Sequence, residues 1–294
     1  MKFSGIVSGL KKAKERWGED PDEIIHDALE AGYDDDFEEA LDILEKGIYL
    51  FDTKLDDKET KSTLWEMKAV ALYELEKYDE SLKAIDMAIK FDKQDPSFWA
   101  DKADILHELE KYDEALDAIK QGSKYAPKDL KIEFVGMQGH LLGHLEKHTE
   151  ALELFNKYLV KYPDDIDTWY DKSDDLVSLE KYKEALEACE EGLKIKPDDN
   201  DLLGQKGYVL LNLNKNEEAI SYFDKAILID PKDDFLWYNK ACALSVLNRK
   251  EETLDALTVA VALDPESIID IKKDKDFDKF RNDERFIRIT KQSI

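Results

Sequence analysis

Large apolar residues recur along this chain at nearly constant steps, and this spacing restricts the fold more than any other feature. The steps are 34, 36, 34, 34 and 34 residues, between Trp65, Trp99, Val135, Trp169, Leu203 and Trp237. Near-equal steps indicate an array of repeats in which each unit buries its apolar face against its neighbours. We therefore expect the 294 residues to form a stack of units instead of one domain around a single core.

Within one repeat, the pattern is typical of two antiparallel helices. Trp99 is followed four residues later by a small residue, Ala103, and Tyr112 marks the turn to the second helix. Gly122 lies on that second helix, and Pro127 ends it. Small residues let helices approach closely, because a bulky side chain there would overpack the interface. Each pair leaves one apolar face exposed until a neighbour covers it.

The pattern resembles the tetratricopeptide repeat family, whose unit reads W-x2-L-G-x2-Y and then A-x3-F, A and P. The resemblance implies an all-α, right-handed superhelical solenoid of about seven helix-turn-helix repeats, with a concave peptide-binding groove lined by the first helices. We place the repeats at residues 21–54, 62–95, 96–129, 132–165, 166–199, 200–233 and 234–267. The sequence departs from the family's leucine at Lys68, Lys102, Lys172, Lys206 and Lys240. We expect the stems of these lysines to cover apolar surface while their charged heads reach water.

Both ends of the chain are expected to be capped. Residues 1–20 have the pattern of a basic amphipathic helix, which would cover the first repeat or dock in an acidic groove of the same or a neighbouring copy. Residues 268–294 carry Phe277, Phe280 and Phe286 and predict C-terminal capping helices. The charged insertion at residues 53–61 is the expected internal hinge.

Charge restricts the class of partner. The formal net charge is -26, which argues against binding to nucleic acid or an anionic membrane and favours basic partners. No apolar run is long enough to span a bilayer, and the N-terminal residues are too charged for a secretory signal. Cys189 and Cys242 are isolated thiols, which fits a reducing, cytoplasmic location.

The resemblance also predicts which residues line the groove. Its centre is acidic and its C-terminal part is rich in aromatic and amide side chains, so a basic ligand would meet the aspartates. The predicted groove residues are Asp101, Asp104, His107, Met137, His140, His144, Tyr170, Asp171, Asp174, Gln205, Tyr208, Asn212, Tyr238 and Asn239. The simpler interpretation, a solvated face of an acidic protein, remains open.

Three histidines lie at steps of four, and they raise the question of a metal site. His140 and His144 fall on one helix face and could share zinc with Asp104 or Asp174. His148 takes the turn position that tyrosine occupies in other repeats, which favours a structural role. We therefore predict no metal site and no cofactor.

No phosphate-binding glycine loop or nucleophile triad is recognisable, so we do not expect an enzyme. The predicted function is a protein–protein interaction scaffold that binds a basic peptide or protein surface in its groove. One alternative is a self-assembling scaffold, in which the basic N-terminal helix docks on a neighbouring copy. Another is a metal- or pH-responsive binding module with His140 and His144 as the switch.

Overall fold

One residue in the left-handed backbone region closes each helical hairpin. Its φ lies between 56° and 59° in every hairpin, at Asp35, Glu76, Glu110, Glu146, Glu180, Asn214 and Asn248. At Glu76, the backbone N–H donates to the Tyr73 carbonyl at 2.8 Å, and the next N–H, of Lys77, donates to Leu72 at 2.8 Å. These bonds satisfy the last carbonyls of the helix, so the chain reverses at regular intervals.

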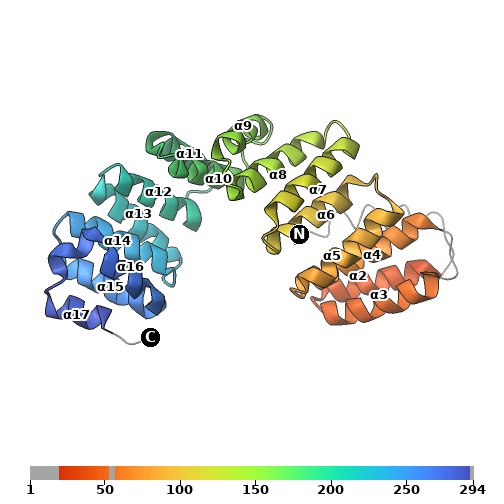
Figure 1. Ribbon diagram of the computed structural model, residues 1–294, viewed down its shortest axis with the longest axis horizontal. Coiled ribbons are helices and arrows are strands. Elements are labelled where there is room, and N and C mark those ends of the chain that lie inside the picture. The colour runs from red at the N-terminus through yellow and green to blue at the C-terminus, as the bar shows by residue number, and fades with distance from the viewer. Residues whose placement is uncertain (1–19, 53–56, 292–294) are drawn as a thin grey trace. The chain divides into compact units, whose positions relative to one another are not determined.

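The computed structural model describes residues 20–52 and 57–291, and it contains helices but no strand in those ranges. The chain forms two compact units, Met1–Lys147 and His148–Ile294 (Figure 1). The first unit contains α2 (Asp20–Tyr33), α3 (Phe37–Asp52), α4 (Lys58–Glu74), α5 (Tyr78–Phe91), α6 (Pro96–Glu108), α7 (Tyr112–Tyr125) and α8 (Lys131–His144). The second contains α9 (His148–Leu159), α10 (Ile166–Ser178), α11 (Tyr182–Ile195), α12 (Asn200–Asn212), α13 (Asn216–Ile229), α14 (Asp234–Val246) and α15 (Lys250–Leu263).

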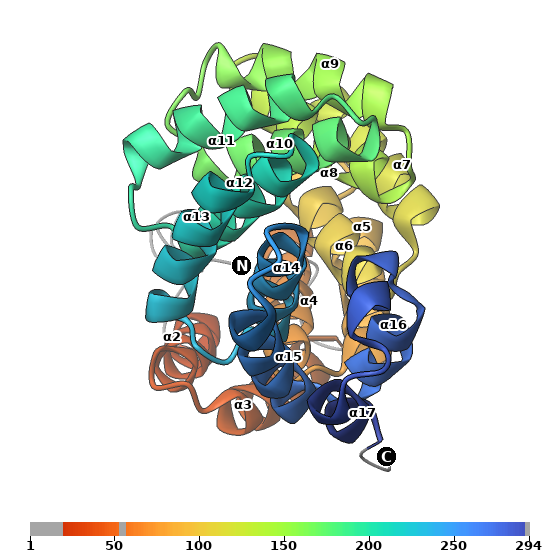
Figure 2. The same cartoon turned by 90° about the vertical axis from the view of Figure 1, so that its left-hand side faces the viewer.

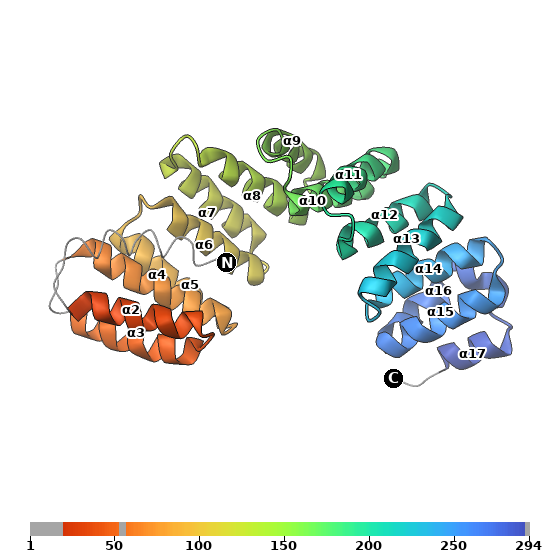
Figure 3. The ribbon, with the colours of Figure 1, turned by 180° about the vertical axis from the view of Figure 1, so that it is seen from behind.

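Successive helices pack side by side within each unit. Figure 3 shows α2 beside α3 and α4 beside α5, and the same pairing joins α10 to α11, α12 to α13 and α14 to α15. Each hairpin also packs on the next one, as α5 does on α6 and α13 on α14. This arrangement confirms the predicted all-α helical repeat fold.

Aspartates begin the first helix of five repeats. Their side chains accept hydrogen bonds from backbone N–H groups of the first turn, at Asp57, Asp95, Asp165, Asp199 and Asp233. The start of a helix carries unpaired N–H groups and a partial positive charge, so a carboxylate there is stabilising. Part of the acidity of the chain therefore serves the fold.

The lysines of the first helices join neighbouring repeats. Their ammonium groups pair with carboxylates on the preceding second helix, Lys68 with Glu45 at 2.8 Å, Lys102 with Asp86 at 2.6 Å, Lys206 with Glu190 at 3.0 Å and Lys240 with Asp224 at 2.5 Å. The side chains of these lysines are only 11–24% exposed. The stems are therefore largely covered, and the charged heads pair with carboxylates that are themselves 48–57% exposed.

Small residues allow the close packing between repeats. Gly122 on α7 faces α6 and α8, and a Cβ atom there would lie 2.5 Å from Phe134 Cε1 and 2.9 Å from Trp99 Cβ. Gly192 on α11 is equally close to Leu202, at 2.5 Å. A side chain at either position would force the neighbouring side chains to move.

Short helices follow α15 at the C-terminal end of the second unit. They are η1 (Pro265–Ser267), α16 (Ile268–Lys273), η2 (Lys275–Phe280) and α17 (Glu284–Thr290). Ile271, Phe277 and Phe286 are buried in the same apolar cluster as residues of α14 and α15. Figure 2 shows α17 beside α15.

Two predicted segments lie wholly or partly outside the described residues. The basic helix expected at residues 1–20 lies outside them except for Asp20, which begins α2, and residues 53–56 of the expected hinge also lie outside them. In the described part, no helix is both long enough and apolar enough to cross a membrane.

Candidate functional site

The predicted groove residues all lie on first helices, divided between the two units. The first unit holds Asp101, Asp104 and His107 on α6 and Met137, His140 and His144 on α8. The second holds Tyr170, Asp171 and Asp174 on α10, Gln205, Tyr208 and Asn212 on α12, and Tyr238 and Asn239 on α14.

A pocket of about 400 Å³ in the second unit brings four of these residues together. Tyr170, Asp174, Gln205 and Tyr208 line it. We call it the acidic–aromatic pocket, and its other lining residues are Val177, Asn200, Asp201, Gly204, Asp233, Phe235 and Leu236. The pocket therefore opens between the first helices of three successive repeats, α10, α12 and α14.

The walls of the acidic–aromatic pocket combine carboxylates with aromatic rings. Its three carboxyl groups are those of Asp174, Asp201 and Asp233, and none of its described lining residues is Lys, Arg or His. The Tyr208 and Phe235 rings lie 5.9 Å apart between centroids. Such a surface favours a cation, because carboxylates and the faces of aromatic rings both attract positive charge.

Hydrogen bonding and burial shape this pocket further. The Gln205 side-chain amide donates to Asp174 Oδ1 at 3.2 Å, which orients the carboxylate. Burial, and then the charges of Asp174 and Asp201, raise the pKa of Tyr170 to about 12, so its hydroxyl keeps its proton. Asn200 also lines the pocket, but its Oδ1 is buried and has no hydrogen-bond partner among the described atoms. The acceptors that a ligand with N–H groups would meet are the carboxylates.

Four predicted residues of the second unit lie outside this pocket. Asp171 is not among the lining residues of the acidic–aromatic pocket, and Asn212 donates its side-chain amide to the Tyr208 carbonyl at 2.9 Å. Asn239 is only 4% exposed and donates to the Phe235 carbonyl at 2.8 Å, so its amide serves the helix. Tyr238 lines a neighbouring cavity of about 580 Å³, and its hydroxyl donates to Asp274 at 2.6 Å.

In the first unit, Asp101 and Asp104 lie in an acidic cluster that also contains Glu66 of α4. Burial raises the pKa of Glu66 to about 9, and the charges of Asp101 and Asp95 add to the effect. Burial together with Asp104 raises the pKa of Asp101 to about 7, and burial raises that of Asp104 to about 6. These carboxyl groups repel one another, so a cation that reached them would be favoured.

Three histidines converge near this cluster. His107 on α6 meets His140 and His144 on α8, with ring centroids 5.2 and 4.7 Å away. One ring nitrogen from each can lie within 4.8 Å of the other two. His148 does not join them, because its Nδ1 lies 2.8 Å from Asp175 Oδ1. Met137, also predicted for the groove, is half-buried on α8.

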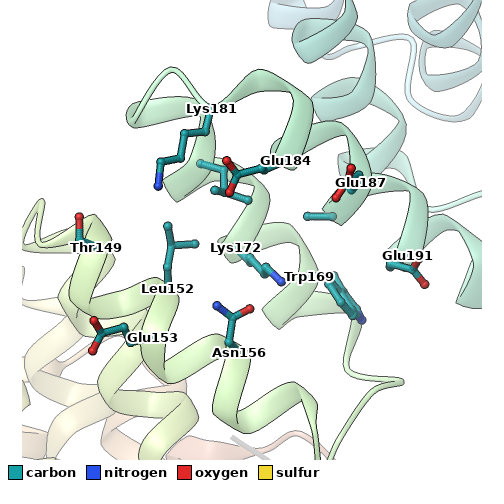
Figure 4. A pocket seen from close by; sticks show the side chains of 12 residues that line it. Thr149, Leu152, Glu153, Asn156, Trp169, Lys172, Lys181, Glu184, Glu187 and Glu191 are labelled. Carbon is teal, nitrogen blue, oxygen red and sulfur yellow. The ribbon is translucent and has the colours of Figure 1, made fainter.

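A further cavity, of about 520 Å³, lies on the side of the second helices α9 and α11. Figure 4 shows Lys172 and Trp169 of α10 inside it, with Asn156 on one side and Glu184 and Glu187 on the other. Asn156 lies 16 residues before Lys172. At the same distance before Lys102, Lys206 and Lys240, the residue is an aspartate or a glutamate. Glutamates of α11 supply negative charge near Lys172 instead. The positive charge of Lys172 is therefore balanced without an anionic ligand in the cavity.

The sequence carried signals for the residues that were not predicted. Glu66 occupies the same repeat position as Tyr170 and Tyr238, and Asp201 the same position as Asp167. Both are groove positions, so the same mapping applied to the second and sixth repeats would have found them. Asn200 and Asp233 lie at the starts of α12 and α14, where they are indistinguishable in sequence from ordinary helix-start residues.

Comparisons with known proteins agree with this architecture. Two models of the tetratricopeptide repeat match, one at residues 166–199 and 201–233 and the other at residues 66–126. No curated protein matches the sequence. The fold is similar to a tetratricopeptide repeat protein from Parabacteroides merdae, with a TM-score of 0.69 and 15% identity over 86% of this chain and 97% of that one.

Two other similar structures cover less of the chain. YrrB, described as a tetratricopeptide repeat protein with an unusual peptide-binding site, has a TM-score of 0.51 and 23% identity over 65% of this chain and 99% of its own. MamA from Desulfovibrio magneticus has a TM-score of 0.53 and 17% identity over 59% of this chain and 97% of its own. At such identities the likeness concerns the fold alone. The repeat spacing, the paired helices and the matching family models together show that this chain contains tetratricopeptide repeats.

Proposed function

We propose that this protein is an interaction scaffold that binds a basic segment of a partner protein, with one Lys or Arg side chain of that segment entering the acidic–aromatic pocket. The observation that carries the proposal is the composition of the pocket, which has three carboxyl groups, three aromatic rings and no cationic lining residue among those described. Tetratricopeptide repeats serve in general as non-enzymatic interaction modules, and the peptide-binding site of YrrB is an example on this fold.

The size and chemistry of the pocket favour a long basic side chain. About 400 Å³ is at the small end of ligand sites, enough for one such side chain and not for a large cofactor. An ammonium or guanidinium group would meet Asp174 and Asp201, while its apolar stem would pack on Tyr170 and Phe235. The net charge of -26 would speed the approach of a basic partner and make binding sensitive to salt.

A peptide array tests this proposal directly. Short fluorescent peptides with one Arg or Lys in varied neutral contexts are compared with the same peptides carrying Gln at that position, by anisotropy with the full chain. We expect binding to require the basic residue. Asp174→Asn or Asp201→Asn should weaken it roughly tenfold, because each removes a charged hydrogen-bond partner.

The matched control is Glu150→Gln, which removes one negative charge from an exposed position on α9 in the same unit. This change should leave the affinity almost unaltered. Equal weakening by all three substitutions would show that overall charge and not the pocket holds the peptide, and would overturn the proposal. Binding that is indifferent to the basic residue would overturn it as well.

A further inference from the structure

Three of the five histidines in the chain meet at one point of the first unit. His140 and His144 are four residues apart, so they project from the same face of α8. His107 reaches them from α6, the first helix of the preceding repeat, and its Nε2 lies 3.1 Å from Nε2 of His144. Two helices and two repeats therefore supply the cluster.

The distances match those of a shared metal ion. Two imidazole nitrogens bound to one tetrahedral zinc ion lie about 3.3 Å apart, given Zn–N bonds of about 2.0–2.1 Å. The Nε2 atoms of His107 and His144 are in hydrogen-bond contact at 3.1 Å, close to that value, and one ring nitrogen from each of the three histidines lies within 4.8 Å of the others. Side-chain rotation would have to bring the three nitrogens to one centre.

Neighbouring residues orient the rings in the way that metal sites require. Nε2 of His107 faces His144, and its Nδ1 lies 3.5 Å from Glu108 Oε1, where a carboxylate can act as an outer partner of the ring. Glu108 also accepts a hydrogen bond from the Tyr73 hydroxyl at 3.2 Å. The Tyr112 ring stacks on His144, with centroids 4.7 Å apart and an angle of 11° between the planes. A carboxylate therefore lies beside one of the three histidines, and a tyrosine ring stacks on another.

We propose that His107, His140 and His144 form a binding site for a divalent transition-metal ion of the zinc class. Three imidazoles suit Zn²⁺, Co²⁺, Ni²⁺ or Cu²⁺, and disfavour Mg²⁺ and Ca²⁺, which prefer oxygen ligands. The bound ion would link α6 to α8 and so fasten two successive repeats together. The site is independent of the acidic–aromatic pocket, which lies in the other unit.

The sequence suggested that His140 and His144 could share a metal ion with a carboxylate of Asp104 or Asp174, and it did not identify the third histidine. The structure supplies His107 instead. His107 and His140 are 33 residues apart, and only the packing of α6 on the neighbouring repeat shows that they meet.

Metal titration of the full chain, prepared with a chelator and without a polyhistidine tag, tests the proposal. Co²⁺ absorption in the visible range reports tetrahedral nitrogen ligation, and calorimetry with Zn²⁺ gives stoichiometry and affinity. We expect one ion per chain at this site. His107→Gln should weaken binding by at least about 100-fold, since it removes a ligand, and Glu108→Gln by about tenfold, as substitutions that orient a ligand do.

His26→Gln is the matched control, because His26 lies on α2 beside Asp27 and Glu30 in an exposed group that resembles an adventitious site. It should leave the Co²⁺ spectrum unchanged. No binding by the wild-type chain would overturn the proposal, and so would full affinity in His107→Gln, which would reduce the site to an ordinary helical histidine pair. Circular dichroism of each variant confirms that the fold is retained, and peptide binding in the second unit provides a separate readout.

Discussion

One buried histidine–aspartate pair in the second unit interrupts the apolar packing that other repeats use. His148 Nδ1 lies 2.8 Å from Asp175 Oδ1, and Asp175 is only 4% exposed with no partner for Oδ2 among the described atoms. Three other repeats have tyrosine at the first position, namely Tyr78, Tyr112 and Tyr182. At the second position, other repeats have a buried apolar residue, as at Ile105, Leu141, Val209 and Ala243.

This comparison predicts a strong coupling between the two residues. His148→Tyr would leave the buried Asp175 carboxyl group without its hydrogen-bond partner, which costs about 1–3 kcal/mol. Asp175→Leu should cost only about 1 kcal/mol, because the histidine side chain, 21% exposed, can bond to water instead. The double variant restores the pattern of the other repeats and should be neutral, or more stable than the wild type by about 1–4 kcal/mol.

Urea unfolding of the four proteins, followed by circular dichroism, measures the coupling as a double-mutant cycle. Repeats can open separately, so hydrogen exchange of α9 and α10 provides the local stability. His148→Tyr should also become less stable as the pH rises, because burial raises the pKa of Asp175 and stability is lost as the pH passes that value. Single variants that each change stability by less than about 0.5 kcal/mol, or additive effects in the double variant, would refute the reasoning.

Further substitutions test other parts of the structure. Gly122→Ala should lower the urea midpoint, since contact with Phe134 and Trp99 costs about 1–3 kcal/mol, more than the roughly 1 kcal/mol gained in helix propensity; a higher midpoint would contradict this account. Because the folded pKa of Glu66 is about 9 and the unfolded value is 4.5, the folded state holds about one more proton than the unfolded state between pH 5 and 9, and stability falls as the pH rises. Glu66→Gln removes this difference, so the slope of unfolding free energy against pH should become shallower by about one proton. Unfolding curves at several pH values measure the slope, and an unchanged slope would place the titration elsewhere. Deleting residues 1–18 should leave the mass measured by light scattering unchanged, whereas a fall from oligomer to monomer would favour self-assembly.

The family of the chain and its all-α repeat fold could be read from the sequence. Apolar residues that return every 34 positions leave each helix pair with an uncovered face, and only stacking covers it. Hairpin turns and helix-starting aspartates such as Asp95 are local features, so they too follow from short stretches of sequence. The same mapping selected Tyr170, Asp174, Gln205 and Tyr208, which the structure places in one pocket.

Other properties depended on side chains that are distant in sequence and meet only after packing. The helical period shows which face a residue occupies, but it does not show which rotamer it adopts or what the next repeat places opposite. For this reason, Asn239 was predicted for the groove and is instead buried with its amide on a helix carbonyl. Likewise, His107 joined His140 and His144 only in the tertiary structure, because one helix supplies two imidazoles by its own spacing and the third comes from a neighbouring repeat.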